Sequence, residues 1–245
     1  MARIAAGLYT LRDADEALPA VIERVGEYVR GVEFAFRVEE ADPAEVAAAL
    51  SRSGLSVTGA HVGPRFREHF DAHVARYRAL GCPALVLSRL PDDCLGSAAA
   101  IEDGVERLRD DAALVGGAGF DFLYHNHDRE FERHDGRLAF DRLVAGTEEA
   151  GVGFVLDVGW VAAAGADPVA VIERYGDRIP QLHIADVNAS GEQVALGDGV
   201  VDVPGCVRAA GEAGVEWLIY EHDQPADPFR TLADAAGRLR ELATA

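Results

Sequence analysis

Two of the chain's eight histidines stand two positions apart in the stretch LYHNHDRE, residues 123–130. The residues before them are mainly apolar, so the stretch is expected to begin as a β-strand. Alternate side chains of a strand share a face, so His125 and His127 should lie together, with Asn126 opposed. Two neighbouring imidazoles could hold a metal ion or transfer a proton. The alternative is a pair of surface histidines in a turn, and the position of this strand in the fold decides between the two.

Other apolar runs also end in residues that could take part in chemistry. After the run that contains His125, the next three strand-like runs end at Asp157, His183 and Glu221. If the four strands are neighbours, these side chains form a His/Asp/His/Glu set of donors. Such mixed donors suit Mn²⁺, Co²⁺, Zn²⁺ or Fe²⁺ better than Ca²⁺, which prefers oxygen ligands alone. One Asp or His at a strand end is often structural, so the interpretation depends on four in succession.

The elements that must position these residues follow a repeating pattern. Five times a helical segment ends in Gly before a short apolar run, as in RALGCPALVLSRL (78–90) and EEAGVGFVLDVG (148–159). Glycine just beyond a helix is its usual left-handed terminator, and the runs have the length and composition of strands. Three further strands are expected to begin near residues 4, 31 and 179. Three Asp-Pro pairs, with Asp as the N-cap, mark helix starts at 42–43, 167–168 and 227–228.

Eight strands that alternate with eight helices predict a parallel sheet covered by helices on its outer face. In a chain of 245 residues, this favours one closed (β/α)₈ TIM barrel, an α/β fold that spans residues 1–245 as a single domain. An open doubly wound sheet is the weaker interpretation, because GLYTLRD after the first strand is not a GxGxxG phosphate-binding pattern. The carboxyl ends of the strands of a TIM barrel meet at one mouth, where the reacting groups lie.

This arrangement would gather the four donors and surround them with further polar residues. The candidates for substrate contacts at the mouth are Glu33, His61, Asn126, His127, Trp160 and Asp186. The indole of Trp160, just beyond Asp157, could form an apolar wall for a sugar ring. Tyr124 and Trp217 are expected instead to pack between the barrel and its helices.

The composition limits the class of partner. A net charge of −19 would repel phosphate backbones, which argues against nucleic-acid binding. No stretch reaches the length of a membrane span, and the start MARIAAGLYT lacks the long apolar region of a signal peptide. Cys82, Cys94 and Cys206 are unpatterned, so neither a disulfide framework nor a cysteine zinc site is indicated. We therefore expect a cytoplasmic protein without nucleic-acid or membrane partners, and the sequence allows a homo-oligomer.

Several segments carry a resemblance to known sequences: GVEFAF, SVTGAHVG, LYHNHDREFERHDGR, FVLDVGWVAAAGADPVAVIERYGDRIPQLHIADV and GDGVVDVPG. They resemble the sugar phosphate isomerase/epimerase family, the xylose-isomerase-like TIM barrels. The resemblance implies one divalent metal ion, held by Glu, Asp, His and Glu at the ends of the last four strands. The expected ion is Mn²⁺, with Mg²⁺, Co²⁺, Zn²⁺ or Fe²⁺ as alternatives. By this match Asp157, His183 and Glu221 are the last three ligands, and His125 occupies the place of the first Glu, as in a YHNH branch of the family.

The resemblance also implies an activity on a keto sugar or a related polyhydroxy ketone. A metal ion on the ketone and its neighbouring hydroxyl acidifies the α C–H and stabilises an enediolate. Glu221 could remove that proton, and His125 or His127 could return one. We therefore expect a metal-dependent isomerase or epimerase, with Glu221 and His125 as catalytic residues. The alternative is a lyase or dehydratase that acts on a keto sugar, a keto-glycoside or an inosose-like substrate through the same intermediate.

Two departures from the family pattern bear on this expectation. Two glutamates of the family's epimerases exchange protons on opposite faces of the substrate, and here His125 replaces one of them. Several relatives carry Lys two residues after the His ligand, where this chain has Ala185. A non-catalytic sugar-binding barrel is therefore a further alternative. The abasic-site nucleases share the fold, but they need several metal ions and a surface that attracts DNA, which a charge of −19 does not supply.

Overall fold

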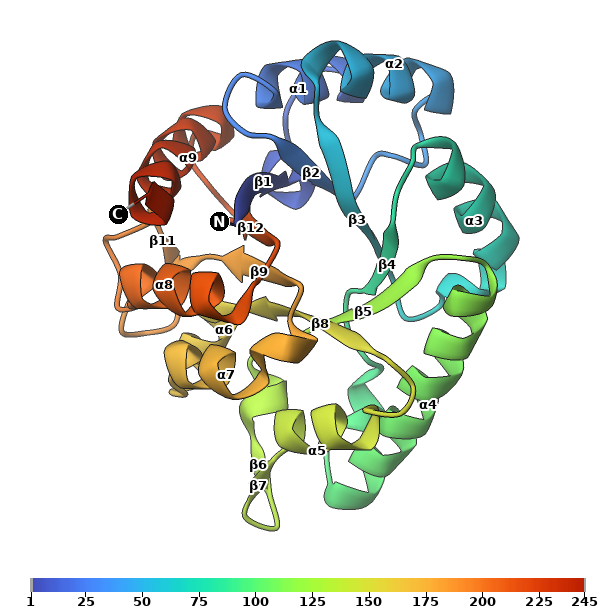
Figure 1. Ribbon diagram of the computed structural model, residues 1–245, viewed down its shortest axis with the longest axis vertical. Coiled ribbons are helices and arrows are strands. Elements are labelled where there is room, and N and C mark those ends of the chain that lie inside the picture. Colours follow the sequence, from blue (N-terminus) through green and yellow to red (C-terminus); the bar gives the residue numbers. More distant parts are fainter. Residues whose placement is uncertain (1, 245) are drawn as a thin grey trace.

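The computed structural model describes residues 2–244, and its centre is a closed barrel of eight parallel strands (Figure 1). Around the barrel the strands follow their order along the chain, and β12 pairs with β1 to close it. Their bounds are β1 (Arg3–Gly7), β2 (Gly31–Phe34), β3 (Ser56–Val62), β4 (Ala84–Leu87), β5 (Asp121–His125), β8 (Gly153–Asp157), β9 (Gln181–Ile184) and β12 (Trp217–Tyr220). The predicted (β/α)₈ TIM barrel is confirmed.

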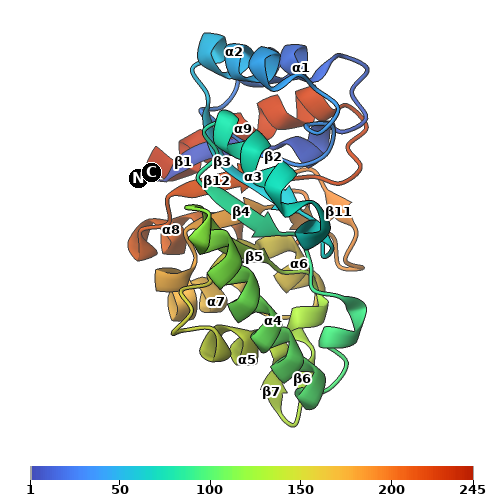
Figure 2. The ribbon, with the colours of Figure 1, turned by 90° about the vertical axis from the view of Figure 1, so that its right-hand side faces the viewer.

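Helices surround the barrel on its outside (Figures 1 and 2). Their bounds are α1 (Leu18–Val25), α2 (Pro43–Ser53), α3 (Phe70–Ala79), α4 (Ala98–Gly117), α5 (Ala139–Gly146), α6 (Val158–Ala163), α7 (Pro168–Tyr175), α8 (Val203–Ala213) and α9 (Pro228–Thr244). Two helices, α6 and α7, lie between β8 and β9, where the sequence predicts one. The additional helix α6 begins directly at the end of β8, so it lies at the mouth of the barrel.

The predicted helix boundaries correspond to hydrogen bonds in the structure. The carboxylates of Asp42 and Asp167 each accept a bond of 2.9 Å from a main-chain N–H of the helix that follows, and Asp227 accepts one of 3.1 Å. Gly54 and Gly214 end α2 and α8 with φ angles of 62° and 77°. In this left-handed region a side chain would be strained, which is why glycine ends these helices.

Two apolar layers stabilise the barrel. The outer layer, between strands and helices, includes Tyr124, which is fully buried and packs edge-on against Phe154 with ring centroids 6.3 Å apart. The inner layer contains one cluster of Ala84, Val86, Leu123 and Val155 and another of Ala5, Trp217 and Ile219. The expectation that Trp217 packs between barrel and helices is not met. It alternates along β12 with Leu218 of the outer layer, and it therefore faces the interior.

The same alternation directs the polar residues at the strand ends into the barrel. Leu123 lies inside the barrel on β5, so His125, two residues later, points the same way. On β8 the interior positions are Val155 and Asp157, and Asp157 is in register with His183 on β9. Strands β5, β8 and β9 are consecutive neighbours in the barrel, which brings these three polar side chains together.

Two short hairpins extend from the barrel. β6 (Arg133–His134) and β7 (Arg137–Leu138) project on the side opposite α1 and α2 (Figures 1 and 2). β10 (Asp186–Val187) and β11 (Gln193–Val194) follow β9. Within residues 2–244, none of the helices combines the length and apolarity that a membrane crossing requires.

Candidate active site

A cavity of about 740 Å³ opens at the carboxyl ends of the strands. Its lining includes five residues at or just beyond the carboxyl ends of barrel strands and one residue of α6: His61, His125, His127, Glu221, Asp223 and Trp160. A second cavity, of about 680 Å³, lies at the opposite end of the barrel, near Arg3, Asp121 and Trp217. The chemistry of TIM barrels takes place at the carboxyl ends, and the clustered imidazoles and carboxylates lie there as well. We therefore take the first cavity as the candidate active site.

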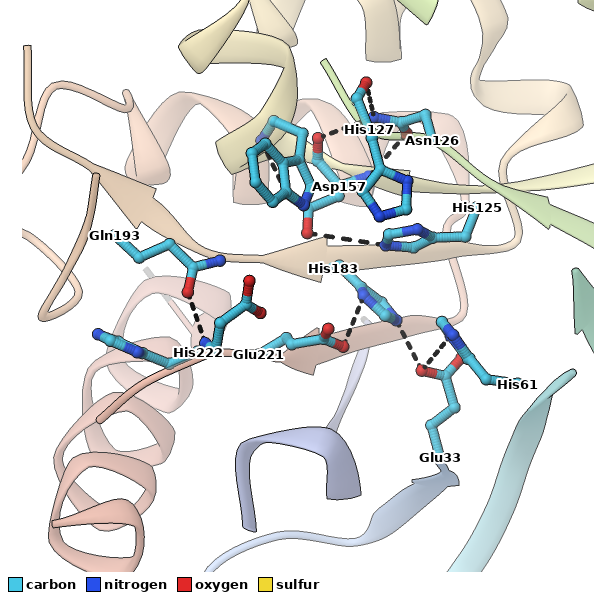
Figure 3. A network of polar contacts seen from close by, with 12 residues as sticks. Glu33, His61, His125, Asn126, His127, Asp157, His183, Gln193, Glu221 and His222 are labelled. Carbon is cyan, nitrogen blue, oxygen red and sulfur yellow. Dashed lines mark hydrogen bonds and ion pairs between the residues drawn. The ribbon is translucent and has the colours of Figure 1, made fainter. Parts of the chain in front are cut away.

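His183 is fully buried behind the residues that line this cavity, and it lies between two carboxylates (Figure 3). Its Nε2 is 2.7 Å from Oε2 of Glu33, and its Nδ1 is 2.9 Å from Oε2 of Glu221. Burial lowers the pKa of His183, but the charges of Glu33 and Glu221 and the bonds to them outweigh it, and the net pKa is well above the ordinary value. Without a metal ion, the imidazole is therefore protonated and neutralises part of the charge of its neighbours.

The pKa values of both carboxylates respond to the same contacts. Burial raises the pKa of Glu221, but the charge of His183 and the contact with it outweigh this and lower that pKa to about 2. For Glu33, burial is again opposed by the charges of His61 and His183, and its pKa lies far below the usual range. His61 contributes because its Nε2 lies 3.0 Å from Oε2 of Glu33. Both carboxylates are therefore ionised at neutral pH.

Asp157 presents one oxygen to the site and uses the other in the fold. Oδ1 accepts a hydrogen bond of 2.9 Å from N–H of Trp160 and so caps α6. Oδ2 lies 3.8 Å from Nε2 of His125. The side chain of Asn126 holds the main chain of Asp157 from β5, because its Oδ1 accepts from Asp157 N–H at 2.9 Å and its Nδ2 donates to Asp157 O at 3.4 Å. Asn126 therefore fixes the position of Asp157 and is itself fully buried.

The donors in the described part of the chain fit a divalent cation. Two groups of three residues each bring one potential ligand atom per residue to within 4.8 Å of the other two. The first group is Glu33, His61 and His183, and the second group is His125, Asp157 and His183. Oε1 of Glu33, Oδ2 of Asp157 and both ring nitrogens of His125 are buried without a hydrogen-bond partner among residues 2–244. Unpaired buried polar atoms cost free energy, and a cation would pair them. Burial lowers the pKa of His125, which keeps the imidazole neutral, as a metal ligand must be.

The predicted ligand set corresponds only partly to these groups. His125, Asp157 and His183 form one of them, and Glu221 lies outside both, although it contacts His183. Glu33, expected to contact the substrate, is 1% exposed and instead joins the other group with His61 and His183. The reason is that Glu33 points inward on β2 and lies beneath the cavity floor rather than on its wall.

Two other predicted substrate contacts, Asn126 and Asp186, are used by the fold. Asn126 holds the main chain of Asp157, as described above. The buried carboxylate of Asp186 accepts main-chain N–H bonds from Val187, Gly197, Gly199 and Val201, at 2.7 to 3.1 Å. Both carboxylate oxygens of Asp186 therefore accept hydrogen bonds from the loop that follows β11. These contacts argue against a role for either side chain in binding substrate.

His127 and Trp160 lie together at the rim of the cavity. Their ring centroids are 5.5 Å apart, and the ring of His127 is 5.0 Å from that of His125. β5 ends at His125, so His127 belongs to the following loop and lies outside both groups of potential ligands. Burial, and then the neighbouring His125, lower the pKa of His127 to about 4. The imidazole is therefore neutral at pH 7 and can both donate and accept a hydrogen bond.

Residues 20–242 match the protein family described as the xylose isomerase-like TIM barrel. The chain belongs to this family. The curated relatives include an inosose dehydratase of Lacticaseibacillus casei, which is 30% identical over 148 residues, 51% of this chain and 48% of that protein. The chain thus spans about half the length of this relative.

Solved structures of low sequence identity share the fold over nearly the whole chain. A sugar phosphate isomerase/epimerase from Parabacteroides distasonis has a TM-score of 0.85 at 20% identity, with 98% of each chain covered. A probable 3-DHS dehydratase, AsbF, from Bacillus anthracis has a TM-score of 0.82 at 12% identity, with 97% of this chain and 98% of that chain covered. At these identities the likeness concerns the fold alone.

In this member of the family, the cavity also contains residues that the sequence analysis left out of the site. Asp223 lines the cavity, and burial, followed by the charges of Glu221 and Asp157, raises its pKa to about 6. Tyr9 and Phe36 form an aromatic pair on the rim, with ring centroids 5.2 Å apart. All three stand just after a barrel strand, so the rule that found the other residues could also have found them.

Proposed function

We propose that this chain is a divalent-metal-dependent lyase that removes water from a cyclic polyhydroxy ketone of the inosose kind. The observation that carries the proposal is the buried group of His125, Asp157 and His183 beside the ionised Glu221, next to a sugar-sized cavity that His125 and Glu221 line. The resemblance to the inosose dehydratase supports elimination over the isomerisation or epimerisation expected from the sequence. The replacement of a second glutamate by His125 supports it as well, because elimination needs only one base to remove the proton.

The residues that would hold the cation are His125, Asp157 and His183, with Glu221 as a further ligand. We propose Mn²⁺ as the ion, since mixed imidazole and carboxylate donors suit it. When bound, the cation supplies a Lewis acid that polarises the ketone and acidifies the neighbouring C–H. Asn126 and Trp160 keep Asp157 in place through its main chain and through Oδ1, which leaves Oδ2 without a hydrogen-bond partner among residues 2–244, as an oxygen that would hold the cation.

Glu221 would remove the proton from the α-carbon. Its carboxylate is ionised and lies on the cavity wall, so it can accept a proton from a substrate that rests on the cavity floor. The electron pair of the C–H bond would form the C=C bond, the C–O bond at the β-carbon would break, and the departing hydroxide would take up the proton that Glu221 removed and leave as water. His127, neutral and at the rim, would hold the departing hydroxyl by a hydrogen bond, and Trp160 would cover the apolar face of the ring.

Isomerisation or epimerisation is the second candidate, and Asp223 favours it. This carboxylate lines the same cavity as Glu221. Two carboxylates on one cavity could take and return a proton at the same or a neighbouring carbon. Both candidate reactions begin with removal of the proton from the α-carbon, so they differ only in what then happens to the intermediate.

The products distinguish the candidates. Loss of the β-hydroxyl from an α,β-dihydroxy ketone gives an enol of a 1,2-diketone, which absorbs ultraviolet light, whereas isomers and epimers do not gain this absorbance. We expect the Mn²⁺-loaded chain to generate the absorbance from a keto-inositol and the Glu221→Gln variant to lose it. Glu216→Gln, an exposed glutamate at the other end of the barrel, is the matched control. A new isomer without absorbance would support the second candidate, and binding without turnover would support a non-catalytic sugar-binding barrel.

The proposed partner is a small molecule, and the net charge of −19 opposes a nucleic acid. A cytoplasmic location and a homo-oligomeric state stay predictions from the sequence.

A further inference from the structure

Tyr124 and Glu130 belong to the same stretch as His125 and His127, but no step of the proposed function uses them. They are 0% and 2% exposed. The Tyr124 hydroxyl donates a hydrogen bond to Oε1 of Glu130 and accepts one of 3.4 Å from N–H of Leu90. Oε2 of Glu130 accepts a bond of 2.8 Å from the main-chain N–H of His127. The carboxylate therefore links a strand of the barrel to the loop that carries His127.

The burial of Glu130 calls for a reason. A carboxylate removed from water costs free energy, and an apolar side chain of similar size would pack at lower cost. Among the described residues, no Lys, Arg or His forms an ion pair with Glu130 within 4.0 Å. The gain must therefore come from its hydrogen bonds, which fix geometry. The geometry that they fix is the position of His127 relative to Tyr124 and Leu90.

The main chain at His127 has no strand to hold it. β5 ends at His125, so the ladder of hydrogen bonds between strands stops before His127. Its carbonyl accepts a bond of 3.3 Å from Nδ2 of Asn126, and its N–H is bound by Glu130. These two contacts replace the ladder, and the imidazole that they place lies between His125 and Trp160 at the cavity rim.

We propose that Tyr124 and Glu130 are positioning residues, which act on the reaction by holding the His127 amide and hence its imidazole at the cavity rim. This inference rests on the proposed function, in which His127 contacts the substrate. Glu130 supplies the acceptor for the amide, and the Tyr124 hydroxyl orients the carboxylate from behind.

Three variants test the network. Glu130→Gln keeps the shape, but it replaces one acceptor by an NH₂ group, so either the Tyr124 hydroxyl or the His127 amide loses its acceptor. Tyr124→Phe removes only the hydroxyl and keeps the bond from His127 to Glu130, so its effect should be smaller. Tyr220→Phe is the matched control, because the Tyr220 hydroxyl is buried and has no hydrogen-bond partner among residues 2–244.

The first readout is the ring resonance of His127 in ¹³C-histidine-labelled protein, assigned by its absence in His127→Ala. We expect Glu130→Gln to shift or broaden this resonance and Tyr220→Phe to leave it unchanged. Bound Mn²⁺ should stay the same, because His125, Asp157 and His183 are untouched. If Glu130→Gln lowers the unfolding temperature but leaves the His127 resonance unchanged, the network is structural and the inference is overturned. Should Glu130→Gln fail to fold, the same readout on Tyr124→Phe decides.

The second readout is a double-mutant cycle with His127→Ala, measured as kcat/KM for a keto-inositol. We expect Glu130→Gln to lower kcat/KM at least about tenfold in the wild-type background, which corresponds to about 1.4 kcal/mol. In the His127→Ala background Glu130→Gln should lower kcat/KM by less than about twofold, because the imidazole that Glu130 positions is already absent. Equal losses in both backgrounds would contradict the inference. If the wild-type chain turns over no keto-inositol, the proposed function fails, and the resonance of His127 still tests the positioning.

Discussion

At the scale of single residues, the site is organised around His183. Its two ring nitrogens face Glu33 and Glu221, at 2.7 and 2.9 Å, and the net pKa of the imidazole is raised, with the two negative charges outweighing burial. A proton on His183 and a bound cation would neutralise the same carboxylates. Metal binding should therefore displace this proton, as metal sites built from imidazoles generally require.

The metal hypothesis predicts a selective effect of two histidine substitutions. His183→Ala removes a donor that both groups of potential ligands share. The affinity for Mn²⁺ should therefore fall by at least about 100-fold, since the loss of a residue that only supports a ligand already costs up to about 100-fold. His127→Ala should retain full Mn²⁺, because His127 belongs to neither group. Atomic spectroscopy after dialysis measures the metal, and circular dichroism checks that the barrel is folded. Full occupancy in His183→Ala would place the metal elsewhere.

The proposed base gives a second prediction at this scale. Glu221→Gln keeps the shape and one oxygen but removes the ionised carboxylate, so binding should persist while the rate falls at least about 100-fold. The measurement is kcat with a keto-inositol, together with its Kd by calorimetry. If Glu221→Gln is nearly as active as the wild type while Asp223→Asn is inactive, then Asp223 is the base.

The sequence allowed some of these residues to be predicted and concealed the roles of others. His125, Asp157 and His183 end apolar runs, and strand alternation together with barrel closure is enough to bring them together. Asn126 and Asp186 also end such runs, but their contacts occupy them in the fold. The loop residues that bind Asp186 lie 11 to 15 positions away, and no periodicity in the sequence indicates such bonds.

At the scale of elements, the loops at the mouth are held by single buried carboxylates. Asp157 caps α6 with one oxygen and presents the other to the site, so this helix start and the candidate metal site depend on the same side chain. The sequence predicted the helices that begin at Asp-Pro pairs, but it did not predict α6, which has only Asp157 as its start signal. The same residue was interpreted as a ligand, and its second use became visible only in the structure.

Asp111 of α4 offers a test of such a contact away from the site. It is fully buried and accepts a hydrogen bond from Arg67, with Arg107 3.6 Å away. Arg67 follows β3, so the pair holds this loop against α4. Asp111→Ala should reduce the free energy of unfolding by about 1–3 kcal/mol, below the usual cost of breaking a buried pair because both arginines reach solvent. Urea denaturation measures it, with the exposed neighbour Asp110→Ala as control, and equal stability of the two variants would contradict this role.

At the scale of the whole molecule, the chain is strongly acidic, and acidic side chains also surround the cavity. Glu39 and Glu40 lie on its rim, in addition to Glu221 and Asp223 inside. The guanidinium of Arg37 on the rim donates to the carbonyls of Ala14 and Glu16. Arg89, the second rim arginine, lies 3.8 Å from Asp92. Main-chain oxygens therefore hold Arg37, Arg89 has an exposed carboxylate nearby, and the field at the mouth is that of an acidic chain with a net charge of −19.

This field predicts a preference for uncharged substrates. A phosphorylated keto sugar carries about two negative charges at neutral pH, and it would meet four carboxylates at the cavity, where each of the two lining arginines already has an oxygen of the protein within 3.8 Å. We expect kcat/KM for a neutral keto-inositol to exceed that for its phosphate ester by at least about tenfold at low salt, and the difference to shrink as salt screens the charges. A preference for the phosphate ester would contradict this assignment of substrate class.

The central claim is that a cation held by His125, Asp157 and His183 allows this chain to remove a proton next to a ketone. The most direct measurement is the entry of solvent deuterium into the α-carbon of a keto-inositol, or into the product formed from it, followed by NMR. We expect exchange or turnover with Mn²⁺, its loss after chelation and its return when Mn²⁺ is restored, with no activity in His183→Ala under any of these conditions. Exchange that persists at full rate in the chelated wild-type chain, or in His183→Ala, would show that the proton is removed without this metal site.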